Sequence, residues 1–234
     1  MKRFRRKDLR RDRFVEEVSH QVEYVSGHRK QFIAAGVAAV VALVGGVGYW
    51  TYSQSVATSS NAALQDAIDL FHGVVTLEEL PGLKTYATES ERIDTITRAL
   101  DAIMLDYSGT AAAAGAAFYS GLLDRDEGNR AEAESHFEQS IRGSGAEYPV
   151  LARLALSAML LEDGDDEAAR ELLQVAVENP TRTVSKDRAS IALARTYIRS
   201  DPEQARSMLS AIQSQNGPAS PLAAALLETL PEGS

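Results

Sequence analysis

The feature that most constrains the fold is an internal repeat in the C-terminal half of the chain. Three segments superimpose: "AFYSGLLDRDEGNRAEAESHFEQSI", "RLALSAMLLEDGDDEAARELLQVAV" and "SIALARTYIRSDPEQARSMLSAI". The third is one residue shorter in its central turn. Gly128 and Gly164 hold the same place in the first two copies and are 36 residues apart. This period predicts an array of helix pairs that must stack, because one pair cannot bury its own apolar face.

The copies share a skeleton of small and large residues. A small residue recurs in the first helix of each copy, as Gly121, Ser157 and Ala194. In the second helix an alanine is followed four positions later by a large apolar residue, in the pairs Ala133 and Phe137, Ala169 and Leu173, and Ala205 and Leu209. Small side chains allow the two helices to approach closely, while the large residue fills the space toward the next copy. The spacing is near the ~34 residues of tetratricopeptide repeats.

The repeat continues in weaker form on both sides. Upstream, "SERIDTITRALDAIMLDYSGT" has apolar residues at helical spacing and is expected to form the second helix of a degenerate first pair. Downstream, "SPLAAALLETL" indicates a closing half-repeat, with Pro221 near its start as Pro149 is in an earlier copy. The region "GVVTLEELPGLKTYATES" is expected to be a connector with a turn at Pro81 and Gly82. Residues 53–234 are therefore predicted to be all-α, a tetratricopeptide-like α-solenoid of about three to four helix pairs.

An uncharged apolar stretch precedes this body. Phe32 to Trp50 spans 19 residues without a charged side chain, and a helix of that length reaches about 28 Å, close to the ~30 Å hydrocarbon core of a bilayer. We expect a single transmembrane helix over residues 31–52. A cleaved signal peptide is the main alternative, because Ser55 and Ala57 have the small-x-small spacing of a cleavage site. The long charged region before the stretch and the length of the stretch argue against cleavage. A buried helix of a globular domain is the third possibility, but it would more often alternate polar and apolar positions.

The charge distribution sets the expected orientation. Residues 1–30 hold ten Lys and Arg against five Asp and Glu, a net charge of +5, whereas the whole chain has a net charge of -9. Basic residues near one end of a span indicate its cytoplasmic side. The head, residues 1–30, is therefore predicted to be cytoplasmic, with a short amphipathic helix carrying Phe14, Val18, Val22 and Val25. Anionic lipid headgroups are its expected ligands in preference to nucleic acid, because the basic cluster adjoins a membrane span.

Small residues recur within the apolar stretch. Ala34, Ala38, Ala42 and Gly46 lie four residues apart and would form one ridge along a helix. Such ridges allow close contact with another membrane helix, although Ala and Gly are also common in membrane helices without a partner.

The chain resembles the YfgM-like family of bitopic inner-membrane proteins. The resemblance rests on the span ending "GGVGYW", the small-polar segment after it, and the second helices "AEAESHFEQSI" and "EAARELLQVAV". It covers the chain from about Gln31 to the C-terminus, while the strongly basic head departs from it. It implies a periplasmic tetratricopeptide-type domain that accompanies the SecYEG translocon, with translocon subunits, periplasmic chaperones or exported chains as partners.

The expected function is therefore a membrane-anchored interaction scaffold, with a protein-binding groove lined by the first helix of each pair. The candidate groove residues are Phe118, Leu122, Arg125, Arg188, Ile191 and Arg195. A core role for the three apolar members is an equal alternative. A structural subunit of another cell-envelope complex, without a peptide groove, is the second hypothesis.

Enzymatic chemistry is not expected. The chain has no cysteine, and its four histidines are scattered. The carboxylates of "LEDGDDEAA" lack the spacing of a calcium loop, and Asp165 or Asp166 is expected to cap the following helix. No nucleotide fingerprint or nucleophile elbow is present. We expect no catalytic residue, no metal and no cofactor.

Overall fold

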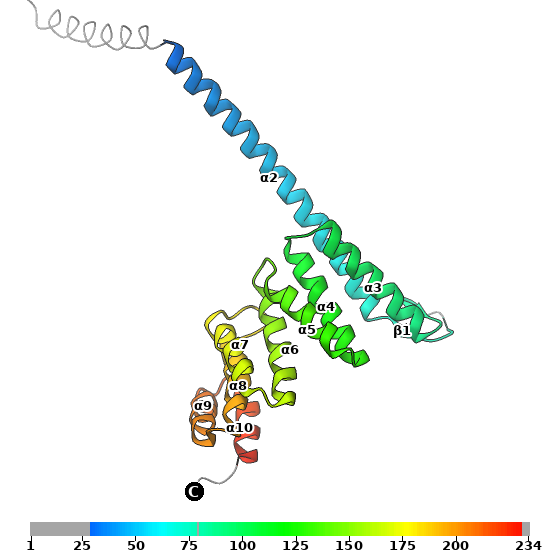
Figure 1. Cartoon of the computed structure of the whole chain (residues 1–234), viewed down its shortest axis with the longest axis vertical. Helices are drawn as coiled ribbons and strands as arrows, with labels where there is room; N and C mark the ends of the chain where they lie inside the picture. Colours follow the sequence, from blue (N-terminus) through cyan, green and yellow to red (C-terminus); the bar gives the residue numbers. More distant parts are fainter. Residues whose placement is uncertain (1–28, 79, 231–234) are drawn as a thin grey trace, which may run out of the picture. The chain divides into compact units, whose positions relative to one another are not determined.

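The computed structural model of the chain describes residues 29–78 and 80–230 (Figure 1). The chain divides into two compact units, residues 1–55 and 56–234. The predicted amphipathic helix of the head lies outside the described residues.

The first unit contains most of α2, Arg29–Phe71. Between Val37 and Tyr52 its large apolar and aromatic side chains are 58–75% exposed. Ala34, Ala38, Ala42 and Gly46 are exposed on the same helix. Within the described part of the chain, none of the helices combines the length and the apolar character that crossing a bilayer requires. The transmembrane helix is thus not confirmed and stays a prediction.

The second unit is built from consecutive helices that pack against their neighbours. After α2 come α3 Glu89–Asp106, α4 Ala111–Glu127, α5 Arg130–Ile141, α6 Glu147–Asp163, α7 Asp166–Glu178, α8 Lys186–Tyr197, α9 Pro202–Ser214 and α10 Ser220–Thr229. From α3 to α10, each helix contacts the next, and the first helix α6 also contacts the first helices α4 and α8 on either side of it. Figure 1 shows this succession from green α4 to red α10. The predicted all-α, tetratricopeptide-like solenoid is confirmed.

Glycines and capping side chains set the boundaries of the helices. Gly128 and Gly164 end α4 and α6 with φ of 81° and 85°, a left-handed conformation that costs glycine little. Asp165 accepts a hydrogen bond from the Ala168 backbone N–H at 3.1 Å and caps α7, as the sequence predicted. The shorter third turn has no glycine. Asp201 caps the start of α9 there, as Asp165 caps the start of α7.

The repeat skeleton forms the core. All six residues of the three alanine and large-residue pairs have an exposed fraction of 0%. At Gly121 the fit is tight, since a Cβ atom would lie 2.7 Å from the Phe137 ring. The degenerate first pair has a core of its own, in which Leu64 of α2 joins Ile96 and Leu100 of α3. The predicted packing of small residues against large ones is therefore confirmed.

The connector contains a short sheet that the sequence did not predict. β1, Val74–Val75, pairs in parallel with β2, Thr85–Tyr86. The Tyr86 side chain is buried, and its hydroxyl donates a hydrogen bond to the Leu70 carbonyl at 3.0 Å. Strands of two residues are too short to show the alternation that identifies a strand in sequence.

Candidate functional site

The first helices of successive pairs line a groove, here called the first-helix groove. Its cavity volume is about 350 Å³. Its walls come from α4, α6, α8 and α10, with the lining residues Phe118, Leu151, Leu154, Ala155, Ser157, Ala158, Leu161, Arg188, Ile191, Ala192, Arg195 and Leu222. Residues more than a hundred positions apart in sequence thus meet on one surface.

The structure brings four of the six predicted groove residues together. Phe118, Arg188, Ile191 and Arg195 line the first-helix groove. Ile191 is also 4% exposed and belongs to the core around α8 and α9, so it serves the core as well as the groove.

The other two predicted residues lie outside the lining. Leu122 packs half-buried against the core cluster that contains Phe137. Arg125 forms an ion pair with Asp126 at 2.9 Å. Both residues sit nearer the C-terminal end of α4 than Phe118 does, and only Phe118 of this helix reaches the groove.

Six arginines outside the first-helix groove form ion pairs with carboxylates within the described residues, but the two arginines of this groove do not. The arginines in ion pairs with carboxylates are Arg92, Arg125, Arg130, Arg142, Arg199 and Arg206. A hydrogen bond to Asp166, for example, raises the pKa of Arg199. Arg188 and Arg195 are exposed, and neither forms an ion pair within the described residues. Two cations are therefore available to a ligand in a chain whose net charge is -9.

An aromatic cluster fixes the α4 side of the groove. The ring of Phe118 lies 5.5 Å from that of Tyr119 and 6.1 Å from those of Phe137 and Tyr148, centroid to centroid. Burial raises the pKa of the Tyr148 hydroxyl, so this side chain is neutral at physiological pH. Ring contacts of this kind hold Phe118 in one orientation and keep its exposed edge in the groove.

Sequence reasoning missed the contributions of α6 and α10. Leu154 of α6 occupies the repeat position of Phe118 and Ile191, and Leu151 that of Arg188. Extending the alignment through the middle copy would have found them. Leu222 is 54% exposed, whereas its counterpart Val150 in the alignment of Pro221 with Pro149 is 3% exposed and does not line the groove, so the alignment did not point to it.

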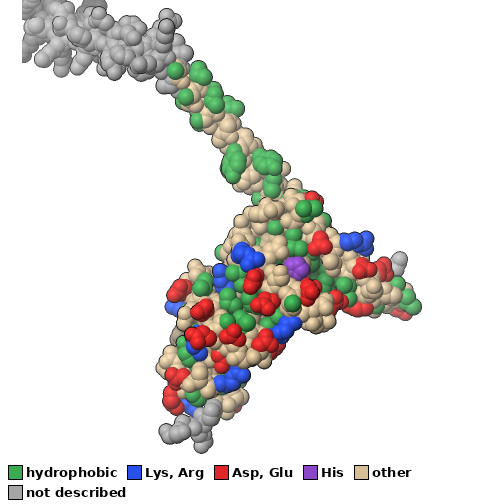
Figure 2. All heavy atoms as spheres, in the orientation of Figure 1, with side chains coloured by type: hydrophobic (Ala, Val, Ile, Leu, Met, Phe, Trp, Pro, Cys, Tyr) green, Lys and Arg blue, Asp and Glu red, His purple; other side chains and the backbone are tan. Residues whose placement is uncertain are grey.

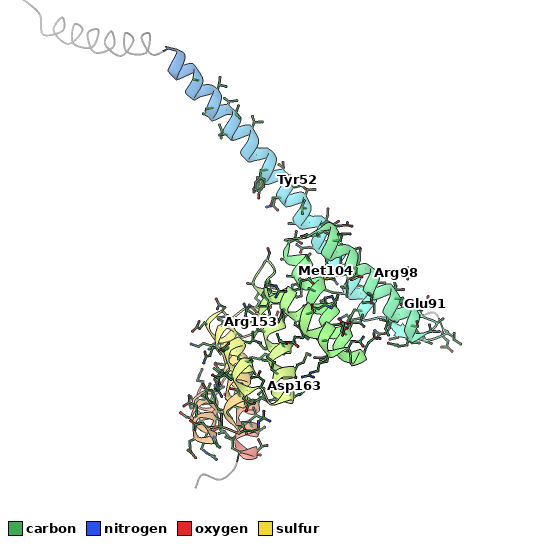
Figure 3. The ribbon with its side chains drawn as sticks, viewed as in Figure 1. Tyr52, Glu91, Arg98, Met104, Arg153 and Asp163 are labelled. Carbon is green, nitrogen blue, oxygen red and sulfur yellow. The ribbon has the colours of Figure 1, made fainter. Side chains whose placement is uncertain are left out.

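A second groove lies on the outer helices, here called the second-helix groove. Its volume is about 560 Å³, and it is lined by α5, α6, α7 and the residues beside them: Glu134, Glu138, Ile141, Arg142, Arg153, Leu156, Leu160, Asp165, Ala168, Glu171, Leu172 and Val175. Arg153 lines this groove from the N-terminal half of α6, and Figure 3 labels it together with Asp163 at the other end of the same helix. The Arg153 guanidinium donates to the Pro149 carbonyl at 3.1 Å, and burial lowers its pKa.

The carboxylates of the predicted acidic turn and His136 have structural partners. The predicted acidic turn is occupied by its cap Asp165 and by Asp166, which pairs with Arg199. His136 Nδ1 lies 2.6 Å from Asp124 Oδ2, across the α4 and α5 pair. Within the described residues, no group of three His, Cys, Asp or Glu side chains is arranged to hold a metal ion. Acidic and basic side chains are interspersed over the face of residues 56–230 seen in Figure 2.

Comparison with known proteins agrees with this architecture. Residues 28–180 match a family described as a tetratricopeptide repeat-like domain, which is more than half of the 234-residue chain. No curated protein and no solved structure shows a significant match. The match ends before α8. The assignment of α8 and α9 as a further repeat therefore depends on the internal repeat in the sequence and on the geometry described above. The chain belongs to the tetratricopeptide repeat-like domain family.

Proposed function

We propose that the chain is a protein-interaction scaffold whose first-helix groove binds an extended segment of a partner protein that carries carboxylates and apolar side chains. The observation that carries this proposal is that Arg188 and Arg195, which form no ion pair with any described residue, lie beside apolar residues from several helices. The two arginines are seven residues apart on α8 and so share one face of the helix. Guanidinium groups bind carboxylates in a bidentate manner, which gives both affinity and orientation.

The apolar lining complements these cations. Phe118 is held by its aromatic neighbours, and Leu222 is largely exposed at the far end of the groove. Contact with an apolar side chain of a ligand would remove the exposed leucine from water, which is favourable, while the neighbouring cations bind the ligand's carboxylates. An interaction scaffold is also the general role of tetratricopeptide repeat-like domains.

We further propose that residues 31–52 anchor the scaffold as a single-pass helix in the cell inner membrane. The head would lie in the cytoplasm and residues 53–234 in the periplasm. This proposal is supported by the 19 uncharged residues from Phe32 to Trp50 and the basic residues before them. Protease added to spheroplasts is expected to digest the C-terminal part and leave the head protected. A released product that begins at Thr58 would contradict this topology and favour a signal peptide.

The resemblance to YfgM-like proteins supports a choice of partners. On that basis the first-helix groove would bind subunits of the Sec translocon, periplasmic chaperones or exported chains. Anionic lipid headgroups would contact the basic head. The alternative is a structural subunit of another cell-envelope complex, favoured by the exposed ridge of Ala34, Ala38, Ala42 and Gly46 on α2.

Site-specific photo-crosslinking of the full-length chain in intact cells tests the proposal. A photoreactive residue at position 222 should yield adducts with translocon subunits or chaperones, and the adducts should disappear when Arg188 and Arg195 are both changed to Ala. The matched control is position 132, which is exposed on α5 outside both grooves. Adducts from position 38 or 42 together with none from position 222 would support the structural-subunit alternative.

A further inference from the structure

The second-helix groove has an apolar floor that the repeat array leaves open. Leu156 and Leu160 of α6 lie four residues apart on one face, and Leu172 and Val175 of α7 complete the floor. Val175 is 39% exposed, whereas Leu156 is 5% exposed. The groove is therefore a shallow apolar surface above a packed core.

Carboxylates without partners stand on the rim of this floor. Glu134 of α5 and Glu171 of α7 are exposed, and neither takes part in a hydrogen bond or ion pair within the described residues. Glu138 is already paired with Arg142 at 3.0 Å. The rim thus offers two free anions from two different helices.

The next repeat shows what fills the equivalent space. Arg170 of α7 holds the repeat position of Glu134, and Tyr197 of α8 that of Leu160. The Arg170 guanidinium lies over the Tyr197 ring, 4.3 Å from its centroid, and donates to the Thr196 carbonyl at 3.4 Å. The equivalent carbonyl between α5 and α6 is that of Met159, and it accepts from Arg130 at the start of α5. Leu160 nevertheless lines the open groove beside Glu134.

We infer that the second-helix groove is a docking surface for a basic amphipathic segment of a partner protein, which places an arginine or lysine over Leu160 between Glu134 and Glu171. The aliphatic stem would cover Leu160, and the charged end would meet Glu134 and Glu171. Long basic side chains bury their stems while keeping the charge at the rim, so both parts of the groove would be used. The chain would then bind partners on two separate surfaces.

The charges at the two ends of the groove also set the direction of the segment. Arg130 at the start of α5 pairs with Asp163 at the end of α6, so these helices are antiparallel and Glu134 lies toward the Asp163 end. Arg153 lies ten residues before Asp163, about 15 Å along the helix. Arg153 has no carboxylate partner within the described residues and makes its end of the groove cationic. The basic residues of the segment therefore belong at the Glu134 end and an acidic residue at the Arg153 end.

Peptide binding to the full-length chain, kept in mild detergent, tests the inference. The probe is a fluorescent helical peptide of about 15 residues, long enough to match α5, with leucines at i, i+3 and i+4 and two arginines near one end. A matched peptide has glutamates in place of the arginines. We expect the arginine peptide to bind at least about tenfold more tightly than the glutamate peptide at low salt, with the difference shrinking at high salt.

Two variants test the site in different ways. Glu134→Arg places the next repeat's arginine in this groove, and it should weaken the arginine peptide about tenfold or more while leaving helicity unchanged. Glu134→Gln with Glu171→Gln removes the charges without filling the space and should abolish the preference for arginine over glutamate. The control Glu132→Arg makes the same charge change on an exposed face of α5 outside the groove and should leave the affinity within about twofold.

Each result decides the question. If the arginine peptide fails to bind at millimolar concentration, binds no better than the glutamate peptide, or binds Glu134→Arg as well as the unaltered chain, the docking surface is refuted. Replacing Arg188 and Arg195 by Ala should not change this affinity, because those residues line the other groove. Loss of binding in that double variant would place the peptide in the first-helix groove and would also overturn the inference.

Discussion

Arg130 donates a hydrogen bond from Nε to Asp163 Oδ2 at 3.0 Å, and this contact joins the start of α5 to the end of α6. The next junction repeats the contact with the charges exchanged. There Asp166 at the start of α7 accepts from the Nε of Arg199, just beyond α8, at 3.2 Å. In each of the two contacts the partners lie 33 residues apart in sequence, so each contact joins one helix pair to the next.

Exchanging the charges of the first contact tests its contribution to stability. Arg130→Asp should lower the midpoint of thermal unfolding, because it places an anion beside Asp163 and Glu162. Arg130→Asp combined with Asp163→Arg should recover part of the loss. The effect should be small and should shrink in high salt, because both partners are well exposed. Circular dichroism melts of the full-length chain measure it, and equal midpoints for the single and double variants at low salt would contradict the role of this pair.

Burying a charge at the repeat alanine should be far more damaging. Ala169 has an exposed fraction of 0%, so Ala169→Glu places a carboxylate in the core without a partner. The expected loss is several kcal/mol, against a total stability of about 5–15 kcal/mol for a domain. The control Gln174→Glu adds the same charge on the exposed side of α7. Denaturant unfolding should separate the two variants clearly, and similar midpoints would argue against the packing described for α7.

The fit between Gly121 and Phe137 predicts an interaction between two substitutions. Gly121→Ser should cost about 1–3 kcal/mol, because its Cβ would lie 2.7 Å from the ring. In the second copy the equivalent positions hold Ser157 and Leu173, so Phe137→Leu should make room for the serine. A double-mutant cycle by denaturant unfolding should therefore give a favourable coupling energy. Simple additivity of the two changes would show that the ring moves aside without cost.

Removing the two groove arginines should affect binding and not folding. Arg188→Ala with Arg195→Ala should change the unfolding free energy by about 0–1 kcal/mol, because exposed charges contribute little. Recovery of partners in pull-downs should fall, more at low salt than at high salt. The control is Arg125→Ala with Arg142→Ala, two exposed arginines outside the first-helix groove. If the first double variant recovers every partner as well as the control does at both salt concentrations, the ridge on α2 becomes the better candidate for the contact surface.

The hydrogen bonds of the Glu147 carboxylate predict that the free energy of unfolding depends on pH. A hydrogen bond from the Thr183 side chain, together with those from the Thr183 backbone N–H at 2.8 Å and the Thr181 hydroxyl at 3.0 Å, lowers the pKa of this carboxylate below the ordinary value. A lowered pKa in the folded state stabilises the fold above the unfolded pKa, and this contribution is lost as the pH falls through the folded pKa. Glu147→Gln should therefore be less stable than the unaltered chain at pH 7. The difference should shrink below about pH 4, and a difference in midpoint that is constant with pH would contradict it.

The helical pairs could be predicted because their signals are local and repeated. Ala133, Ala169 and Ala205 recur with a large residue four positions on, and all are buried as the pattern requires. Asp165 could be recognised as a cap because it follows Gly164 directly. Such features depend on helix geometry alone, which one sequence is enough to reveal.

The groove lining was only partly predictable because it depends on contacts between repeats. Arg125 shares a helix with Phe118, but it pairs with its neighbour Asp126 and does not reach the groove. Leu222 lines the groove from α10, whereas its aligned counterpart Val150 lies in the core. The second-helix groove was missed for a similar reason. Its rim has Glu134 where the next copy has Arg170, and an alignment that seeks common residues overlooks such a difference.

The exchanged charges of Arg130 with Asp163 and Asp166 with Arg199 also bear on how such a gene can evolve. Repeat arrays change length by unequal recombination, which deletes or duplicates one unit. Loss of the middle unit here would bring Arg130 against Arg199, and its duplication would bring Asp166 against a second copy of Glu162. Like charges at a junction oppose stacking. A shorter or longer array assembled from the same parts would therefore have a repulsive contact at a junction where the present array has an ion pair.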